Sequence, residues 1–160
     1  MSAAVMDATG QLAAARLLVD LLERGDLPPV QWNVYAISPG DLAGQISHYS
    51  GDLAARLKAL SVYAALLGVP VILRRWIPRE KGGSLHARGA LHGVAVDVWT
   101  AVDADELAAL DGPELAGTLG ERVACSGCQV EMFALPGVPL TAMPHVCPRC
   151  APYTPSAGGI

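Results

Sequence analysis

The sequence predicts an α+β protein, a two-layer sandwich of about four strands with helices on one face, followed by a small cysteine-bearing module. Two observations predict the sandwich. Helical and extended periodicities alternate over residues 9–110, and a hairpin pattern, SLHARGALHGVAVDVWT, lies among them. A third observation predicts the module, since all four cysteines fall between Cys125 and Cys150.

The first helices and strands follow from apolar spacing and from breaks in the chain. Residues 9–24 predict a helix with one apolar side and with Gly25 as its stop. Alternation over VQWNVYAI, residues 30–37, predicts a strand, and a loop or short helical turn is expected over SPGDLAGQISHYSG. A second helix then ends at Gly68, and residues 69–76 return as a strand. The apolar residues expected on one side of each helix are Leu12, Ala15, Val19 and Leu22 in the first, and Leu53, Leu57, Leu60, Ala64 and Leu67 in the second.

The hairpin segment predicts its own register, because His92 and Gly93 form a plausible two-residue turn. The apolar face then pairs Leu91 with Val94, Gly89 with Val96 and Ala87 with Val98. The opposite face pairs Ala90 with Ala95, Arg88 with Asp97 and His86 with Trp99. The sequence DADE, residues 103–106, predicts a capping box that opens a third helix ending near Leu110.

The polar face of this sheet combines aromatic and cationic side chains. Five cations against Glu80 give residues 74–88 a local charge of +4, although the whole chain carries −4. Arginines that neutralise phosphates, beside rings that stack on bases, are what a nucleic-acid contact requires. The candidate binding surface is Tyr35, Arg74, Arg75, Trp76, Arg79, Lys81, His86, Arg88 and Trp99.

Three interpretations of this surface stay open. A protein partner, or docking of the cysteine module, is favoured over nucleic acid because the chain as a whole is acidic. The third interpretation is a solvated face with cross-strand ion pairs, such as Arg88 with Asp97.

The four cysteines form two CxxC pairs, CSGC and CPRC, with eighteen residues between them. Each CxxC turn presents two thiolates on one side of a tight loop, and two such loops complete a tetrahedron around a zinc ion. A redox pair of the thioredoxin kind would need only one CxxC. His145, near Cys147, is an alternative ligand, but four thiolates already fill a structural site.

These two pairs, at this spacing, resemble the knuckles of a zinc ribbon over about thirty residues. The resemblance implies that Cys125, Cys128, Cys147 and Cys150 are the ligands of one structural zinc ion. It implies a metal and says nothing about a biological role.

Residues 11–110 resemble uncharacterised small proteins of actinobacteria and of their phages or mobile elements. The resemblance rests on DLPP before the first strand, ALLGVPV before the second and HARGALHGVAVDVWT as the hairpin. It implies an origin and an α+β fold, with no activity to carry over.

A cytoplasmic location is expected, and with it metal binding in place of disulfides. The longest apolar run, VYAALLGVPVIL, is interrupted by Gly68 and Pro70 and is shorter than the roughly 20 residues that span a bilayer. The segment MSAAVMDATG lacks the basic start of a secretory signal. In a reducing compartment, paired CxxC motifs hold metal more often than they form disulfides.

The sequence therefore predicts a small zinc-binding module that acts by contact with a protein or a nucleic acid. The expected organisation is an α+β domain at 1–111, a linker at 112–121, a zinc ribbon at 122–151 and a flexible tail at 152–160. The alternative is an enzyme of unknown reaction built on His86 and Asp97, with His92, Glu80 and Lys81 nearby. No nucleophile elbow, phosphate-binding glycine loop or HExxH pattern supports that alternative, so a binding role is favoured.

Overall fold

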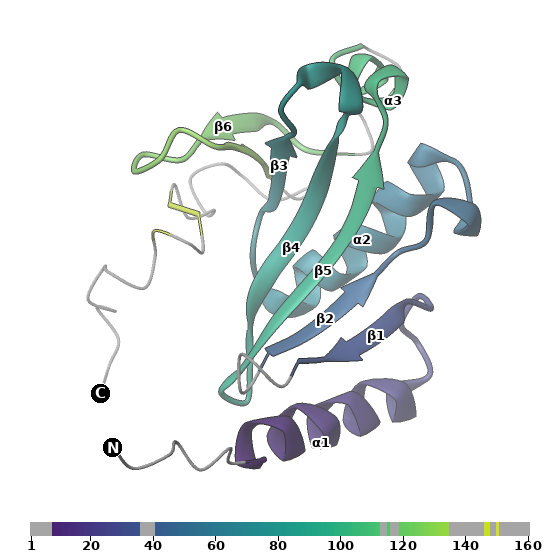
Figure 1. Cartoon of the computed structure of the whole chain (residues 1–160), viewed down its shortest axis with the longest axis vertical. Helices are drawn as coiled ribbons and strands as arrows, with labels where there is room; N and C mark the ends of the chain where they lie inside the picture. Colours follow the sequence, from purple (N-terminus) through teal and green to yellow (C-terminus); the bar gives the residue numbers. More distant parts are fainter. Residues whose placement is uncertain are drawn as a thin grey trace.

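The structure, a computed structural model, describes residues 8–35, 41–112, 115, 119–134, 146, 147 and 150. It is an α+β fold with helices on one face of a mixed sheet (Figure 1). The elements in chain order are α1 (Thr9–Arg24), β1 (Gln31–Val34), β2 (Asp41–Gln45), the 3₁₀ turn η1 (His48–Ser50), α2 (Leu53–Leu67), β3 (Val71–Arg75), the 3₁₀ turn η2 (Arg79–Lys81), β4 (Gly83–Leu91), β5 (Val94–Val102), α3 (Ala104–Leu110), β6 (Arg122–Ala124) and β7 (Glu131–Phe133).

The sheet has seven strands in the order β1-β2-β5-β4-β3-β7-β6, so the expectation of about four strands is wrong. Only β2 and β5 pair in parallel; the other neighbours are antiparallel. The sequence of β2, DLAGQ, lies where a loop or short helical turn was predicted, and its Asp and Gly are poor strand formers. It becomes a strand by pairing on both sides, and Gly44 leaves room for Trp32, whose Cζ3 would lie 2.9 Å from an added Cβ.

The β4–β5 hairpin confirms the predicted register at all six residue pairs. His92 has φ 49° and Gly93 has φ 78°, the positive values that a tight two-residue turn requires. On the apolar face, Gly89 lets α2 approach closely, since an added Cβ would lie 3.1 Å from the Cβ of Leu67. The hairpin turn thus fixes which side chains face the helices and which face away.

The helices pack on one face of the sheet, as expected, but α1 uses a different stripe of its surface. Its buried residues are Ala14, Leu17 and Leu21. All four residues predicted to form its apolar side, Leu12, Ala15, Val19 and Leu22, are exposed, Leu22 at 64%. The sequence has apolar residues on two sides of this helix, so periodicity alone did not decide between them.

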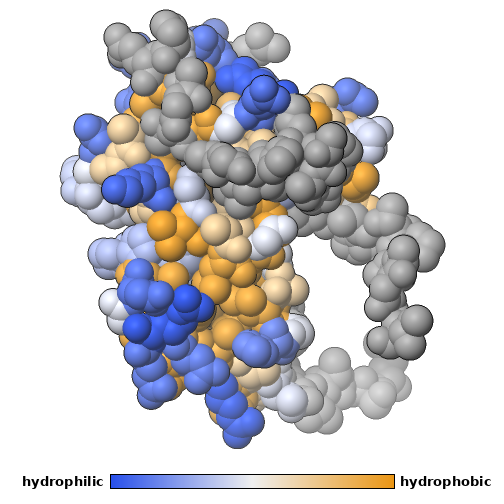
Figure 2. All heavy atoms as spheres, turned by 180° about the vertical axis from the view of Figure 1, so that it is seen from behind, coloured by the Kyte–Doolittle hydropathy of each residue, from blue (hydrophilic) through white to orange (hydrophobic). Residues whose placement is uncertain are grey.

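Helix α2 buries four of the five predicted side residues, and the fifth, Leu67, is partly buried. The helix is apolar on most of its surface. Its outward positions are mainly alanines together with Val62, and Figure 2 shows the resulting apolar band from the helix side of the molecule. Within the described part of the chain, no helix has the length and apolar character needed to cross a bilayer.

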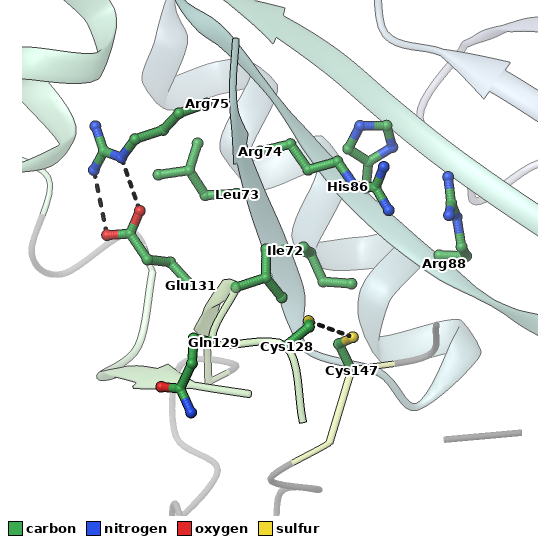
Figure 3. A pocket seen from close by; sticks show the side chains of 11 residues that line it. Ile72, Leu73, Arg74, Arg75, His86, Arg88, Cys128, Gln129, Glu131 and Cys147 are labelled. Carbon is green, nitrogen blue, oxygen red and sulfur yellow. Dashed lines mark hydrogen bonds and ion pairs between the residues drawn. The ribbon is translucent and has the colours of Figure 1, made fainter. Parts of the chain in front are cut away.

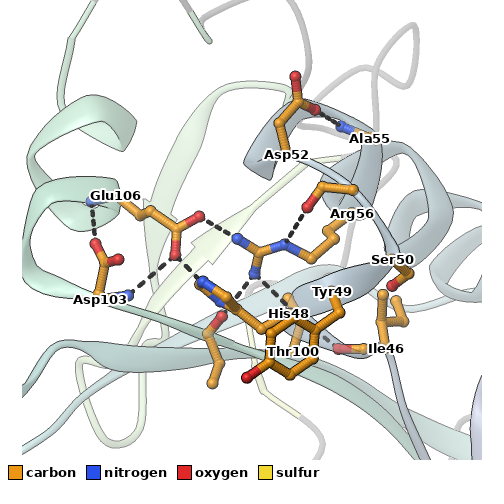
Figure 4. Close-up of polar contacts among 12 residues, drawn as sticks. Ile46, His48, Tyr49, Ser50, Asp52, Ala55, Arg56, Thr100, Asp103 and Glu106 are labelled. Atoms are coloured by element: carbon orange, nitrogen blue, oxygen red, sulfur yellow. Dashed lines mark hydrogen bonds and ion pairs between the residues drawn. The ribbon is translucent and has the colours of Figure 1, made fainter.

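A buried arginine on α2 ties the helix to the end of the sheet (Figure 4). Arg56 is 2% exposed and forms an ion pair with Glu106 of α3. Its guanidinium also donates to Thr100 Oγ1 at 3.1 Å and to the carbonyl of Ala101 at 2.7 Å. Glu106 in turn completes the predicted capping box with Asp103, which the structure confirms. One carboxylate therefore neutralises a buried cation and caps a helix.

The β6–β7 hairpin joins the same sheet, because β7 pairs with β3 from Val71 to Leu73. Charged side chains reinforce this junction: Glu131 accepts from Arg75 and Arg122, and Asp111 pairs with the same two arginines. Leu119 is buried in the main core. The division into domain, linker and ribbon stays a prediction, and residues 152–160 lie outside the described part.

Candidate metal centre

Four cysteines from two distant segments lie together beside β3 and β7. The Sγ atoms of Cys125, Cys128, Cys147 and Cys150 are all within 4.8 Å of one another. Cys128 Sγ and Cys147 Sγ are 3.6 Å apart, close to the roughly 3.8 Å edge of a tetrahedron with 2.3 Å zinc–sulfur bonds. All four are free thiols, and this separation is far from the roughly 2.05 Å of a disulfide. The arrangement could hold one metal ion.

The first CxxC turn is shaped by its backbone. The N–H of Gln129 donates to the carbonyl of Cys125, and Gln129 itself has φ 65°, which turns the chain back into β7. The N–H groups of Gly127 and Cys147 both point at Cys125 Sγ, at 3.4 and 3.3 Å. A side chain at Gly127 would put its Cβ 3.0 Å from Cys150 Sγ. Glycine therefore lets the second cysteine pair approach the first.

These contacts shift the acidity of the thiols in opposite directions. Burial would raise the pKa of Cys125, but backbone N–H donors from Cys147, Cys128 and Gly127 lower it to about 6. Hydrogen bonding to Cys147 raises the pKa of Cys150 to about 12, and burial raises that of Cys147. A metal ion that binds here must displace the remaining protons, so its affinity should rise with pH.

The thiols lie on the face of the sheet opposite the helices. Cys125 and Cys147 are buried against Ile72 of β3 and Met132 of β7, in a small core separate from the main one. Ile72 and Met132 face each other across the β3–β7 ladder. Cys125 and Cys147 therefore cover β3 and β7 on this face of the sheet.

A cleft of about 440 Å³ runs between the cysteines and β4 (Figure 3). Arg74, His86 and Arg88 line one side of it, and Cys128 and Cys147 line the other. A neighbouring cleft of about 340 Å³ is lined by Tyr35, Arg88 and Asp97 among others. The polar face is thus hollowed on both sides of Arg88.

Ion pairs neutralise part of the predicted basic surface. Arg75 points to the helix side, where it donates to Glu131 at 2.8 Å, and Arg88 donates to Asp97 at 2.9 Å. The side chain of Arg74 makes no hydrogen bond or ion pair with any described residue, and Lys81 is exposed. The side chain of Arg79 lies outside the described part of the structure. Two of the five predicted cations are therefore neutralised.

Two adjacent large apolar side chains are exposed where β3 leaves the sheet. Trp76 is 40% exposed and Ile77 is 95% exposed. Tyr35, at the far side of the sheet, is 49% exposed. Trp99, by contrast, is partly buried and stacks on His86, with ring centroids 6.1 Å apart.

His86 belongs to a polar chain on this face. Ser84 Oγ lies 2.8 Å from His86 Nε2, and His86 Nδ1 lies 3.0 Å from Asp97 Oδ1. Burial would raise the pKa of Asp97, but hydrogen bonds and charge from His86 and Arg88 lower it overall. His86 and Asp97 were singled out from the sequence, but Ser84 was not. The signal for Ser84 was its position two residues before His86, which puts both side chains on one face of a strand.

The structure also groups His48, Asp103 and Glu106 within ligand distance of one another. Glu106 already pairs with the buried Arg56, and Asp103 accepts the backbone N–H of Glu106. These contacts account for both carboxylates, so the group does not indicate a metal site. The predicted alternative ligand His145 lies outside the described residues.

Comparison of the chain with models of protein families, with curated proteins and with solved structures gave no match.

Proposed function

We propose that this chain is a zinc-binding protein with one structural site, and that it acts by binding a protein partner. The observation that supports zinc is the convergence of four thiols from two CxxC pairs. Four thiolates in a tetrahedron suit zinc and leave no open position for substrate. The proposal includes a reducing, cytoplasmic setting, where thiols stay free for metal, and an origin in a phage or mobile element.

The partly buried surroundings support a structural role for the metal. Cys125 and Cys147 pack against the sheet, and the Cys125 backbone is bonded to that of Val130 and Gln129. A metal at this place would fix the β6–β7 hairpin and the second CxxC pair on the polar face. It would thereby fix one wall of the 440 Å³ cleft.

The exposed pair Trp76 and Ile77 supports a protein partner over nucleic acid. Interfaces are centred on large aromatic and apolar side chains that become desolvated on binding, and these two residues are adjacent and exposed. A phosphate-binding surface needs several unpaired cations, but Arg75 and Arg88 are held by carboxylates. The loop after β3 is therefore the proposed contact.

Replacing Trp76 and Ile77 together with serine should abolish co-purification of the partner with the tagged protein from its native host. Loss of a central aromatic anchor costs about 2 kcal/mol or more, which corresponds to roughly 30-fold weaker binding. The measurement is quantitative mass spectrometry of the captured proteins, with and without nuclease.

The matched control is Leu22→Ser, which removes another exposed apolar side chain, on α1. It should leave capture unchanged. Capture that disappears on nuclease treatment would instead indicate nucleic acid. So would capture that falls steeply with salt and survives the double substitution, and either result would contradict the protein-partner proposal.

A further inference from the structure

Three side chains of the polar face form a hydrogen-bonded chain with the connectivity of a nucleophile, a base and an orienting carboxylate. Ser84 and His86 are two residues apart on β4, so both point to the same face. Asp97, on β5, pairs with Arg88 in the ladder and reaches His86 diagonally. The distances are 2.8 Å from Ser84 Oγ to His86 Nε2 and 3.0 Å from His86 Nδ1 to Asp97 Oδ1.

The order of donors and acceptors in this hydrogen-bonded relay determines its chemistry. Arg88, whose guanidinium lies 2.9 Å from Asp97, and His86 stabilise the ionised form of Asp97. The carboxylate therefore accepts a hydrogen bond from His86 Nδ1–H. That bond fixes the imidazole tautomer with Nε2 unprotonated, facing the Ser84 hydroxyl. Trp99 stacks on the ring, with 18° between the planes, and holds its orientation. Ser84 therefore faces a base that can take its proton.

An arginine whose side chain has no hydrogen-bond or ion-pair partner among the described residues lies beside the serine. Arg74 is the residue opposite Ser84 in the β3–β4 ladder, and the register puts both on the polar face. Arg74 and His86 line the same 440 Å³ cleft. Figure 3 shows the Arg74 side chain extending from β3 toward His86. A guanidinium at this place could stabilise a negatively charged oxygen that forms on a carbon bonded to Ser84 Oγ.

We propose that Ser84, His86 and Asp97 form an acyl-transfer site that hydrolyses small carboxylic esters. Ser84 is 5% exposed and lies at the edge of the 440 Å³ cleft, whose lining residues include its partners His86 and Arg74 but not Ser84 itself. The proposal does not depend on the identity of the metal or of the protein partner, although the cysteines line one wall of the same cleft.

The reaction balances with an ester and water as the only reactants. Ser84 Oγ bonds to the carbonyl carbon while its proton passes to His86 Nε2, and the developing oxyanion faces Arg74. The bond to the leaving alcohol breaks, and His86 returns the proton to that alcohol. Water then attacks the acyl group, loses a proton to His86, and the bond to Ser84 Oγ breaks as Ser84 regains its proton. The net products are a carboxylic acid and an alcohol.

The test uses the full, metal-loaded chain with p-nitrophenyl acetate and, separately, with a fluorophosphonate that phosphonylates activated serines. We expect hydrolysis above the buffer rate and a covalent adduct that peptide mass spectrometry places on Ser84. Ser84→Ala should lower the rate to background, and Asp97→Asn should lower it about 100-fold or more because the imidazole then adopts the wrong tautomer. The adduct on the unsubstituted protein needs no variant and so does not depend on how well a variant folds.

The control is Ser61→Ala, since Ser61 is another partly buried serine, whose hydroxyl donates to the carbonyl of Leu57 at 2.9 Å. It should keep the full rate and the full adduct. Absence of an adduct on Ser84, or a rate that Ser84→Ala leaves unchanged, would overturn the proposal. Metal content and partner capture are measured on the same samples, so failure of this site is distinguishable from failure of the zinc or binding assignment.

Discussion

Replacing Glu106 with alanine should lower the free energy of unfolding by about 3–5 kcal/mol, the usual effect of removing one partner of a buried ion pair. The guanidinium of Arg56 is almost fully buried, and Glu106 is the carboxylate that neutralises it (Figure 4). Without Glu106, the cation keeps hydrogen bonds to Thr100 and Ala101 but has no counter-charge. The capping bond to the N–H of Asp103 is lost as well. Urea denaturation of the metal-loaded protein measures the change.

Two further variants separate the buried charge from the helix cap. Asp105→Ala removes an exposed acid from the same first turn of α3 and should cost less than about 1 kcal/mol. The double variant Arg56→Met, Glu106→Gln removes the buried charge altogether and should recover much of the stability. A Glu106→Ala loss no larger than that of Asp105→Ala would show that Arg56 is not held by this pair.

Removing the metal should unfold the β6–β7 hairpin and expose one edge of β3, while the centre of the sheet stays protected. Structural zinc sites contribute roughly 10 to 16 kcal/mol of apparent binding free energy, and this segment has only a small core of its own. Because β7 pairs with β3, the amides of Val71 and Leu73 should lose protection together with those of Glu131 and Phe133. Helix α2 and the β4–β5 hairpin pack in the main core and should not change.

Hydrogen exchange before and after chelation measures this effect residue by residue. Cys128→Ser should reproduce the chelated pattern, and Ser126→Ala, in the same turn, should leave the pattern of the metal-loaded protein unchanged. Exchange that rises uniformly over all helices and strands would contradict a role confined to one end of the sheet.

The β4–β5 hairpin and the caps were predictable because their signals are local. A two-residue turn with Gly93 sets the register of all six predicted pairs, and Asp103 and Glu106 are three residues apart as a capping box requires. That register places Arg88 opposite Asp97, so their ion pair could be predicted from the sequence alone. Each of these features depends on neighbours within one supersecondary unit.

The features that escaped prediction depend on tertiary contacts. Strand β2 forms because β1 and β5 offer it partners on both sides, although Asp41 and Gly44 disfavour a strand. The pairing of β7 with β3 joins segments about sixty residues apart, and no local pattern indicates it. Arg75 carries the same charge as Arg74, but it is the next residue along the strand and so points to the opposite face, where it pairs with Glu131. Charge counting along the sequence therefore overstated the basic surface.

The measurement that tests the central claim most directly is zinc content combined with X-ray absorption of the freshly reduced protein. We expect one zinc per chain, coordinated by four sulfur atoms at about 2.3 Å. Cys125→Ser should lower both the occupancy and the sulfur count. Less than half an equivalent of zinc, or a coordination shell made mainly of nitrogen and oxygen, would contradict a site built from Cys125, Cys128, Cys147 and Cys150.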